Sequence, residues 1–357
     1  MQGRTLSTNN DSIAQDNELD LTRLPTNFGT RKLVSIDPDY KREYNVETAL
    51  SVQHELLRGI SVSGGWYHRA YYNIGVGGVR TADLGLLGYN TNWTFDSYVP
   101  VQVVSPYNGE VFTAYNLKSA GLLSQVDKLI TNSKSNRQVY NGFEVAVEGR
   151  LPGGGSILTS VITQRTITNT CNQPDDPNRQ RFCDRFNLPA PYKGVAFRSD
   201  FKLAGSYPLP FGLQVSGDFT SVPGWAGSSN IIANDEILPI NWNITRTTRY
   251  TAADCAGRPC TAGALVIPNL VQTGLILPLA PAGTERQLER QNQLNFGVRK
   301  LFRIGRYEWS GEFNLFNALN ADTVLNEQSA NFGTATYAAP SSIILGRMPR
   351  LALRLKW

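Results

Sequence analysis

The chain has 357 residues, with 34 lysines and arginines against 29 aspartates and glutamates, and a net charge of +5. The charges are scattered, and the lack of a basic run or an Arg/Lys-rich helix argues against nucleic acid as a partner. The longest apolar runs fall far short of the ~20 residues of a transmembrane helix, while the 15 tyrosines and 15 phenylalanines favour strands.

The first segment, residues 1–40, is polar, and Pro25 and Pro38 interrupt any regular run. We therefore expect an irregular loop there. Residues 1–10 are polar and lack an apolar core, so no export signal is recognisable at this point. The repeating pattern described next belongs to residues 41–357, which we expect to form a second unit.

Alternation of apolar and polar residues begins at Tyr44, where Leu50 and Val52 share one face and Glu47 and Gln53 the other. A tight turn near Gly59 leads into the second strand of a hairpin. We predict nine principal strands, over residues 44–56, 60–69, 143–151, 157–169, 197–207, 213–220, 294–299, 307–315 and 350–357. Alternation is weak over 157–169, and the sequence does not assign the faces of that strand.

The terminal stretch from Ser342 follows the last long connection, and from Arg350 onward it has a strict period of two. Its two faces are formed by Leu351, Leu353, Leu355 and Trp357 on one side and by Arg350, Ala352, Arg354 and Lys356 on the other. Pro349 is unusual in such a strand, because proline cannot donate a hydrogen bond to the neighbouring strand.

The connections between the predicted strands alternate between short and long. The long ones cover about residues 73–137, 170–194, 222–287 and 318–341, and they contain strand-like runs at Tyr98–Val104, Glu110–Tyr115 and Ile237–Thr248. Antiparallel up-and-down strands with this order have every short turn at one end of the sheet and every long loop at the other. Outer-membrane barrels combine short periplasmic turns with long extracellular loops in this way.

The predicted fold is therefore all-β, an antiparallel up-and-down transmembrane β-barrel that is partial, with long extracellular loops. Apolar side chains would face lipid and charged side chains a hydrated interior, with Tyr44, Trp66, Tyr207, Tyr307 and Trp357 near strand ends as interfacial aromatics. A β-sandwich whose apolar faces pair with each other is the alternative.

Several stretches resemble the barrel of TonB-dependent outer-membrane receptors, specifically the Oar-like kind with an N-terminal carboxypeptidase-regulatory-like domain. They are the runs 141–154 (beginning NGFEV), 201–212 (FKLAGSYPLPFG), 311–320 (GEFNLFNALN) and 351–357. The resemblance implies a barrel of about 22 strands closed by a plug domain in the intact protein. It also implies uptake of a scarce substrate, powered through TonB.

Nine strands are too few for such a barrel, and bacterial single-chain barrels have even numbers of strands. No plug domain and no TonB-contacting box is recognisable. We therefore expect the C-terminal portion of an outer-membrane receptor barrel. Its expected partners are outer-membrane lipid, the missing N-terminal strands and plug, and TonB only through that plug. A surface adhesin or binding β-protein without transport is the alternative function.

The four cysteines form two close pairs, Cys171 with Cys183 and Cys255 with Cys260, each within one long connection. At an oxidising cell surface we expect two disulfides that stiffen these loops. A zinc site of all four cysteines and free thiols are the alternatives; the wide first pair argues against zinc. Asp175, Asp176 and Asp184 are expected to form a solvated acidic loop, and calcium binding is the alternative.

No catalytic constellation is recognisable, and we expect no cofactor, no metal and no enzymatic activity. His54 and His68 fall within predicted strands, and Glu308 with Glu312 is interpreted as polar lining of the barrel interior. The Gly75–Gly78 run is expected to be loop rather than a nucleotide site. The sequence does not identify the substrate: residues of the long connections would determine it, and the aromatic ones among them (Trp93, Tyr98, Trp225 and Trp242) suit many ligands.

Overall fold

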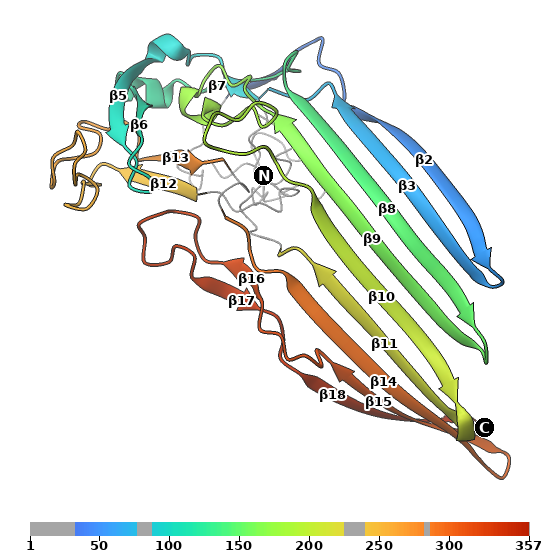
Figure 1. The fold of residues 1–357 in the computed structure, drawn as a ribbon. Helices are drawn as coiled ribbons and strands as arrows, with labels where there is room; N and C mark the ends of the chain where they lie inside the picture. The colour runs from blue at the N-terminus through green and yellow to red at the C-terminus, as the bar shows by residue number, and fades with distance from the viewer. Residues whose placement is uncertain (1–32, 77–87, 225–239, 282–285, 357) are drawn as a thin grey trace, which may run out of the picture.

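The main element is an antiparallel sheet of nine strands, in a computed structural model that describes residues 33–76, 88–224, 240–281 and 286–356 (Figure 1). The strands are β2 (Tyr44–Leu57), β3 (Ile60–Tyr72), β8 (Arg137–Leu151), β9 (Gly155–Asn169), β10 (Arg198–Leu209), β11 (Leu213–Val222), β14 (Gln291–Ile304), β15 (Tyr307–Phe316) and β18 (Met348–Lys356). Each principal strand pairs with the next one along the chain. The predicted all-β, up-and-down fold with nine principal strands is confirmed.

The sheet is open rather than closed into a barrel. Its order runs from β18 at one edge to β2 at the other, and these two strands do not pair with each other in the described part of the chain. The short turns, at residues 58–59, 152–154, 210–212 and 305–306, lie at one end of the sheet, where β18 also ends (Figure 1). The long connections lie at the opposite end, as the order of connections predicts.

The register aligns the apolar residues of successive strands on one face of the sheet. Val145 of β8 lies opposite Gly64 of β3 and Val161 of β9, and Phe313 of β15 lies opposite Leu351 of β18. These side chains have no covering layer: Leu50 is 66% exposed, Val145 55% and Leu353 64%. The exposed face argues against a sandwich, in which the apolar faces would be covered.

The weak alternation of β9 has a simple cause. Ile157 and Val161 lie on the apolar face with their neighbours Gly205 and Phe201 of β10. Leu158 and Ile162 occupy the other face, where Leu158 lies between Glu148 and Ala204 and Ile162 lies between Glu144 and Asp200. Both parities of this strand are therefore partly apolar, which hides a period of two.

Several predicted boundaries are wrong. Residues 342–357 do not form one strand: β17 (Pro340–Ile343) pairs with β16 (Val324–Glu327), and β18 begins only at Met348. Trp66 lies in the middle of β3 rather than near its end. Leu33–Ile36, within the segment expected to be irregular, forms β1; residues 1–32 and Trp357 lie outside the described residues.

The long connections fold into small sheets of their own. β5 (Tyr98–Val104) pairs with β6 (Val111–Leu117), and β12 (Ile240–Thr245) pairs with β13 (Gly274–Ala280). β1 pairs with β7 (Asp127–Ile130), which also pairs with β4 (Tyr89–Asn90). The short 3-10 helices are η3 (Phe95–Ser97), η4 (Ala120–Ser124), η5 (Pro177–Gln180) and η6 (Pro210–Gly212), the last within a short turn. We call the described residues of the four long connections the cap.

The buried core of the described residues lies in the cap, and not between the faces of the main sheet. Its members are Val103, Val104, Phe112, Ala114, Ile240, Trp242, Ile244, Tyr250, Val266, Ile267, Leu270, Leu275, Leu277, Leu279 and Ala280. They come mainly from the β5–β6 and β12–β13 hairpins and from the loop between β12 and β13. No helix in the described ranges is both long and apolar enough to cross a membrane.

Candidate functional site

The cap is one packed unit, because side chains of one long connection fill the space beside the next. Val103 and Val104 of β5 belong to the same buried cluster as Ile244 of β12 and Leu277 of β13, and all four are nearly inaccessible. The hydroxyl of Tyr250 accepts a hydrogen bond of 3.0 Å from the backbone N–H of Val104. Burial raises the pKa of the Tyr250 hydroxyl above its ordinary value.

Arg181 joins three connections just after η5. Its Nε donates to the carbonyl of Pro278, in β13, at 2.8 Å, and its Nη2 donates to Glu110, before β6, at 2.7 Å. The guanidinium lies 3.9 Å from the ring centroid of Phe112 and 4.4 Å from that of Phe182. Planar stacking combined with two directed hydrogen bonds requires arginine rather than lysine at this position.

The side chain of Asn178, in η5, forms hydrogen bonds with β6 of the kind that a neighbouring strand would form. Its side-chain carbonyl accepts from the N–H of Tyr115 at 2.8 Å, and its side-chain amide donates to the carbonyl of Tyr115 at 2.9 Å. Asn178 is 4% exposed. This pair of bonds satisfies the edge of β6, which would otherwise present unpaired backbone groups.

Two aspartates lie where η5 meets the β4 and β5 strands. The side-chain carboxylate of Asp175 accepts a hydrogen bond from the backbone N–H of Asn90. The backbone carbonyl of Asp175 accepts one from the Tyr98 hydroxyl. Asp176 caps η5 through the N–H of Asn178 at 3.1 Å. Burial raises the pKa of Asp176 despite the nearby Arg179, and burial beside both carboxylates also raises the pKa of Tyr98.

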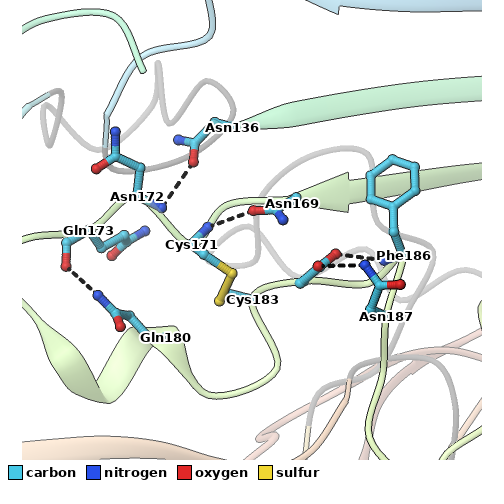
Figure 2. The surroundings of a disulfide bond; sticks show 10 residues. Asn136, Asn169, Cys171, Asn172, Gln173, Gln180, Cys183, Phe186 and Asn187 are labelled. Carbon is cyan, nitrogen blue, oxygen red and sulfur yellow. Dashed lines mark hydrogen bonds between the residues drawn. A yellow bond between two sulfur atoms is a disulfide. The ribbon is translucent and has the colours of Figure 1, made fainter. Parts of the chain in front are cut away.

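The cysteines form disulfides in the pairing that their spacing predicts, Cys171 with Cys183 and Cys255 with Cys260. Figure 2 shows the first among amide side chains: Asn169 accepts from the Cys171 N–H, and Asn136 accepts from the Asn172 N–H. The side-chain amide of Gln180 donates a hydrogen bond to the backbone carbonyl of Gln173 across the loop. The disulfide therefore closes the segment from which η5 and Arg181 reach the other connections.

The aromatic residues of the long connections that suit a ligand are mostly structural. Tyr98 is 5% exposed and Trp242 6%, and Trp242 belongs to the cap core. The Trp93 indole donates to the carbonyl of Leu122 at 3.0 Å, and Trp225 lies outside the described residues. Their bulk stabilises the cap instead of lining a binding surface.

A cavity of about 230 Å³ opens on the cap beside Arg181. It lies between the β5–β6 hairpin, η5 and β13, and is lined by Phe95, Phe112, Thr113, Tyr115, Pro177, Asn178, Gln180, Arg181 and Leu277. The rings of Phe95 and Tyr115 meet edge to face, with centroids 5.9 Å apart and planes at 79°. Sequence reasoning singles out none of these lining residues, because they converge from three separate connections.

The face of the main sheet opposite the apolar one is polar and charged. Glu312 of β15 lies between Arg299 of β14 and Arg354 of β18, with 3.6 Å from its Oε1 to the Nε of each. Glu308 pairs with Arg303 at 3.4 Å on the same face. The two glutamates are therefore held by cross-strand arginines, which agrees with the predicted polar lining.

The remaining candidate residues do not assemble into one site. The Asp184 carboxylate accepts from Phe186 and Asn187 rather than joining Asp175 and Asp176. His68 contacts Asn141 at 2.8 Å, and His54 lies on β2 opposite Val62. Within the described residues, no group of three or more His, Cys, Asp or Glu is placed to hold a metal ion. Gly77 and Gly78 lie outside the described ranges.

The fold and the cap define a class: an open, up-and-down antiparallel sheet with one exposed apolar face, one charged face and a folded cap. No family model matches the chain, and no curated protein matches it either. Among solved structures, it is similar to the outer membrane transporter YddB from Escherichia coli, with a TM-score of 0.41 and 10% identity. The match covers 90% of this chain and 34% of that one, so the chain spans about a third of the transporter's length.

Proposed function

We propose that the chain forms a wall segment of a TonB-dependent receptor in the bacterial outer membrane. In the intact protein the barrel would take up a scarce substrate past a plug, and TonB would act only through that plug. The role is binding and transport rather than catalysis. The missing strands, the plug and outer-membrane lipid are the partners.

The observation that carries this proposal is the exposed apolar face. Large aliphatic and aromatic side chains follow one another across nine hydrogen-bonded strands, and Leu351 is 82% exposed. A soluble protein rarely exposes a continuous apolar patch of this kind. In contact with lipid, an apolar patch no longer carries the free-energy cost that it has in water. The antiparallel sheet supplies the backbone hydrogen bonds that lipid cannot form.

The polar face and the cap support the same proposal. A barrel wall needs a hydrated inner face, and the Arg299–Glu312–Arg354 group occupies three successive strands of that face. A receptor also needs a substrate-binding element at the cell surface, and the cap occupies the long-connection end of the sheet (Figure 1). Disulfides in the cap suit an oxidising surface.

Adjacent residues of β18 provide a direct test of lipid exposure. Leu353 lies on the apolar face and Ala352 on the polar face, and all four native cysteines are disulfide-bonded. In intact membranes, an introduced Leu353→Cys should resist a water-soluble maleimide and react with a lipid-soluble one. Ala352→Cys should react with the water-soluble reagent. Equal aqueous labelling at both positions would contradict a membrane location.

Transport is tested separately. Cells that depend on the protein for growth on a limiting nutrient should lose that growth when TonB is deleted. The second candidate, a surface adhesin, is favoured by the separate core of the cap, which suits binding without transport. Surface binding that persists while uptake is unaffected by TonB would support the adhesin.

A further inference from the structure

We propose that the cap cavity beside Arg181 is a binding site for one neutral sugar ring of a saccharide ligand. This names a substrate class for the proposed receptor, and it rests on the proposed function only for the step from binding to uptake. Three properties of the cavity carry the inference: its size, its mixed lining and the state of its one charged side chain.

The size of the cavity limits the ligand. Its volume of about 230 Å³ is the space of roughly eight water molecules at ~30 Å³ each. It is smaller than the ~300–1,000 Å³ of sites for drug-sized ligands. One ring of a larger molecule fits it, with the rest of that molecule remaining outside.

The lining offers two kinds of surface at once. Phe95 and Phe112, with Pro177 and Leu277, supply apolar contacts, and Phe95 remains 48% exposed at the cavity. Thr113, Tyr115 and Gln180 supply hydroxyl and amide groups. A pyranose ring has the matching character, because its C–H face packs on aromatic rings while its hydroxyls form hydrogen bonds.

The cavity has no unbalanced charge with which to favour an anion. Arg181 is paired with Glu110 at 2.7 Å, so its charge is largely neutralised. Its Nη1 and the Tyr115 hydroxyl have no hydrogen-bond partner in the described part of the chain, and both residues line the cavity. These groups can donate to hydroxyl oxygens of a neutral ligand.

The site is also held rigidly before any ligand arrives. Asn178 fixes the backbone of Tyr115 with two hydrogen bonds, and Arg181 is fixed by Pro278 and Glu110. The Cys171–Cys183 disulfide closes the segment that carries both Asn178 and Arg181. Preformed geometry lowers the entropic cost of binding, which matters for a small ligand with few contacts.

The test is calorimetric titration of the assembled protein, purified from the cells that make it. The probes are glucose, galactose, mannose, N-acetylglucosamine and their disaccharides, with glucuronate as an anionic comparison. At least one neutral sugar should bind. Phe95→Ala should weaken that binding by at least tenfold, because it removes the exposed ring.

Two further variants keep the test decisive. Tyr115→Phe removes only the hydroxyl and leaves the backbone bonds to Asn178, so it should fold normally and weaken binding about threefold to tenfold. Phe211→Ala removes an 86% exposed aromatic ring from a short turn at the other end of the sheet and should change nothing. Melting temperatures of all variants serve as the folding check.

Three results would overturn the inference. They are no binding by any neutral sugar, unchanged binding in both Phe95→Ala and Tyr115→Phe, or tighter binding of glucuronate than of its neutral counterpart. Cysteine labelling of β18 separates this outcome from the fate of the proposed function. Lipid exposure without sugar binding removes only the sugar site, whereas sugar binding without lipid exposure removes the receptor and keeps the site.

Discussion

Gly212 is required by both backbone conformation and packing in the turn between β10 and β11. Its φ of +70° suits glycine, and a Cβ there would lie 2.7 Å from the carbonyl oxygen of Leu301 on β14. Gly305, in the next short turn, has a φ of +60°, but a Cβ on it would meet no heavy atom within 4 Å. A Cβ at either position would cause backbone strain, but only a Cβ at Gly212 would also cause a steric clash. Comparing the two positions therefore distinguishes the two effects.

Gly212→Ala should lower the free energy of unfolding more than Gly305→Ala does. Both variants carry the cost of placing a residue with a Cβ in the left-handed region, about 1–2 kcal/mol. Only Gly212→Ala must also displace a backbone carbonyl, which adds about 1–3 kcal/mol. Denaturant unfolding of the assembled protein measures the difference, and equal losses in the two variants would show that the contact with Leu301 is unimportant.

Asp176 should make the cap less stable as the pH rises. Its pKa is raised in the folded cap above the ordinary value of 3.8, mainly by burial, so the folded state holds the proton more tightly than the unfolded state. The resulting stabilisation is complete below pH 3.8 and is lost as the pH rises through the folded-state pKa.

Hydrogen exchange of the Tyr115 amide reports this change, because that N–H is bonded to Asn178 of the helix that Asp176 caps. Its protection should fall as the pH rises through this window, after correction for intrinsic exchange. Asp176→Asn keeps a capping oxygen without the charge and should flatten the profile. A profile that is unchanged in Asp176→Asn would assign the pH dependence to other groups.

At the scale of elements, η5 has only four residues but positions two side chains that contact other connections, Asn178 within it and Arg181 directly after it. Arg181→Ala should destabilise the cap by about 1–3 kcal/mol, since it leaves the Pro278 carbonyl and Glu110 without their donor. Arg179→Ala is the matched control. Its side chain is 56% exposed and pairs only with Asp176 among the described residues, so the expected loss is below ~1 kcal/mol.

Native-state hydrogen exchange across β6 and β13 measures both variants. Exchange in β6 and β13 should accelerate together in Arg181→Ala, because Arg181 contacts both hairpins. Acceleration of one hairpin alone would mean that the cap is two independent units.

The principal strands could be predicted from sequence because their side chains obey a local rule. In β2 and β18 apolar and polar residues alternate along the strand, so a period of two appears within each one. The pairing of cysteines 12 and 5 residues apart is similarly local. Even β9 is predictable as a strand, although its faces are not.

The cap could not be predicted in the same way. Its contacts join residues far apart in sequence, such as Val104 with Tyr250, 146 positions away. The sequence does indicate strand-like runs where β5, β6 and β12 lie, but the four residues of β7 and of β16 show little alternation. Arg181 and Asn178 carry no recognisable motif, and their roles arise only when three connections meet.

At the scale of the whole molecule, the two free edges of the sheet decide how the chain assembles. β2 and β18 each present unpaired backbone groups along one side in the described structure. In lipid each unsatisfied group costs several kcal/mol. The chain placed alone in a bilayer should therefore associate edge to edge with other copies, whereas the assembled protein should not.

Cross-linking distinguishes these states. Cysteines introduced at Ser51 of β2 and Ala352 of β18 should form disulfides between copies when the chain is reconstituted alone. The same variants should give no such dimers in the membranes of cells that make the protein. A reconstituted chain that stays monomeric, with both cysteines reactive, would mean that the edges are satisfied by some other means.

The different sequence distances within sheet and cap also have a kinetic consequence. Within each hairpin of the sheet the two strands meet across a turn of two or three residues, whereas the cap joins residues about 150 positions apart, as in the bond from Asn116 to Asn269. Closing long loops is slower than zipping hairpins. We therefore expect the hairpins of the sheet to form first and the cap to pack last. In pulse-labelling hydrogen exchange during folding, the amides of β8 should become protected from exchange before those of β13.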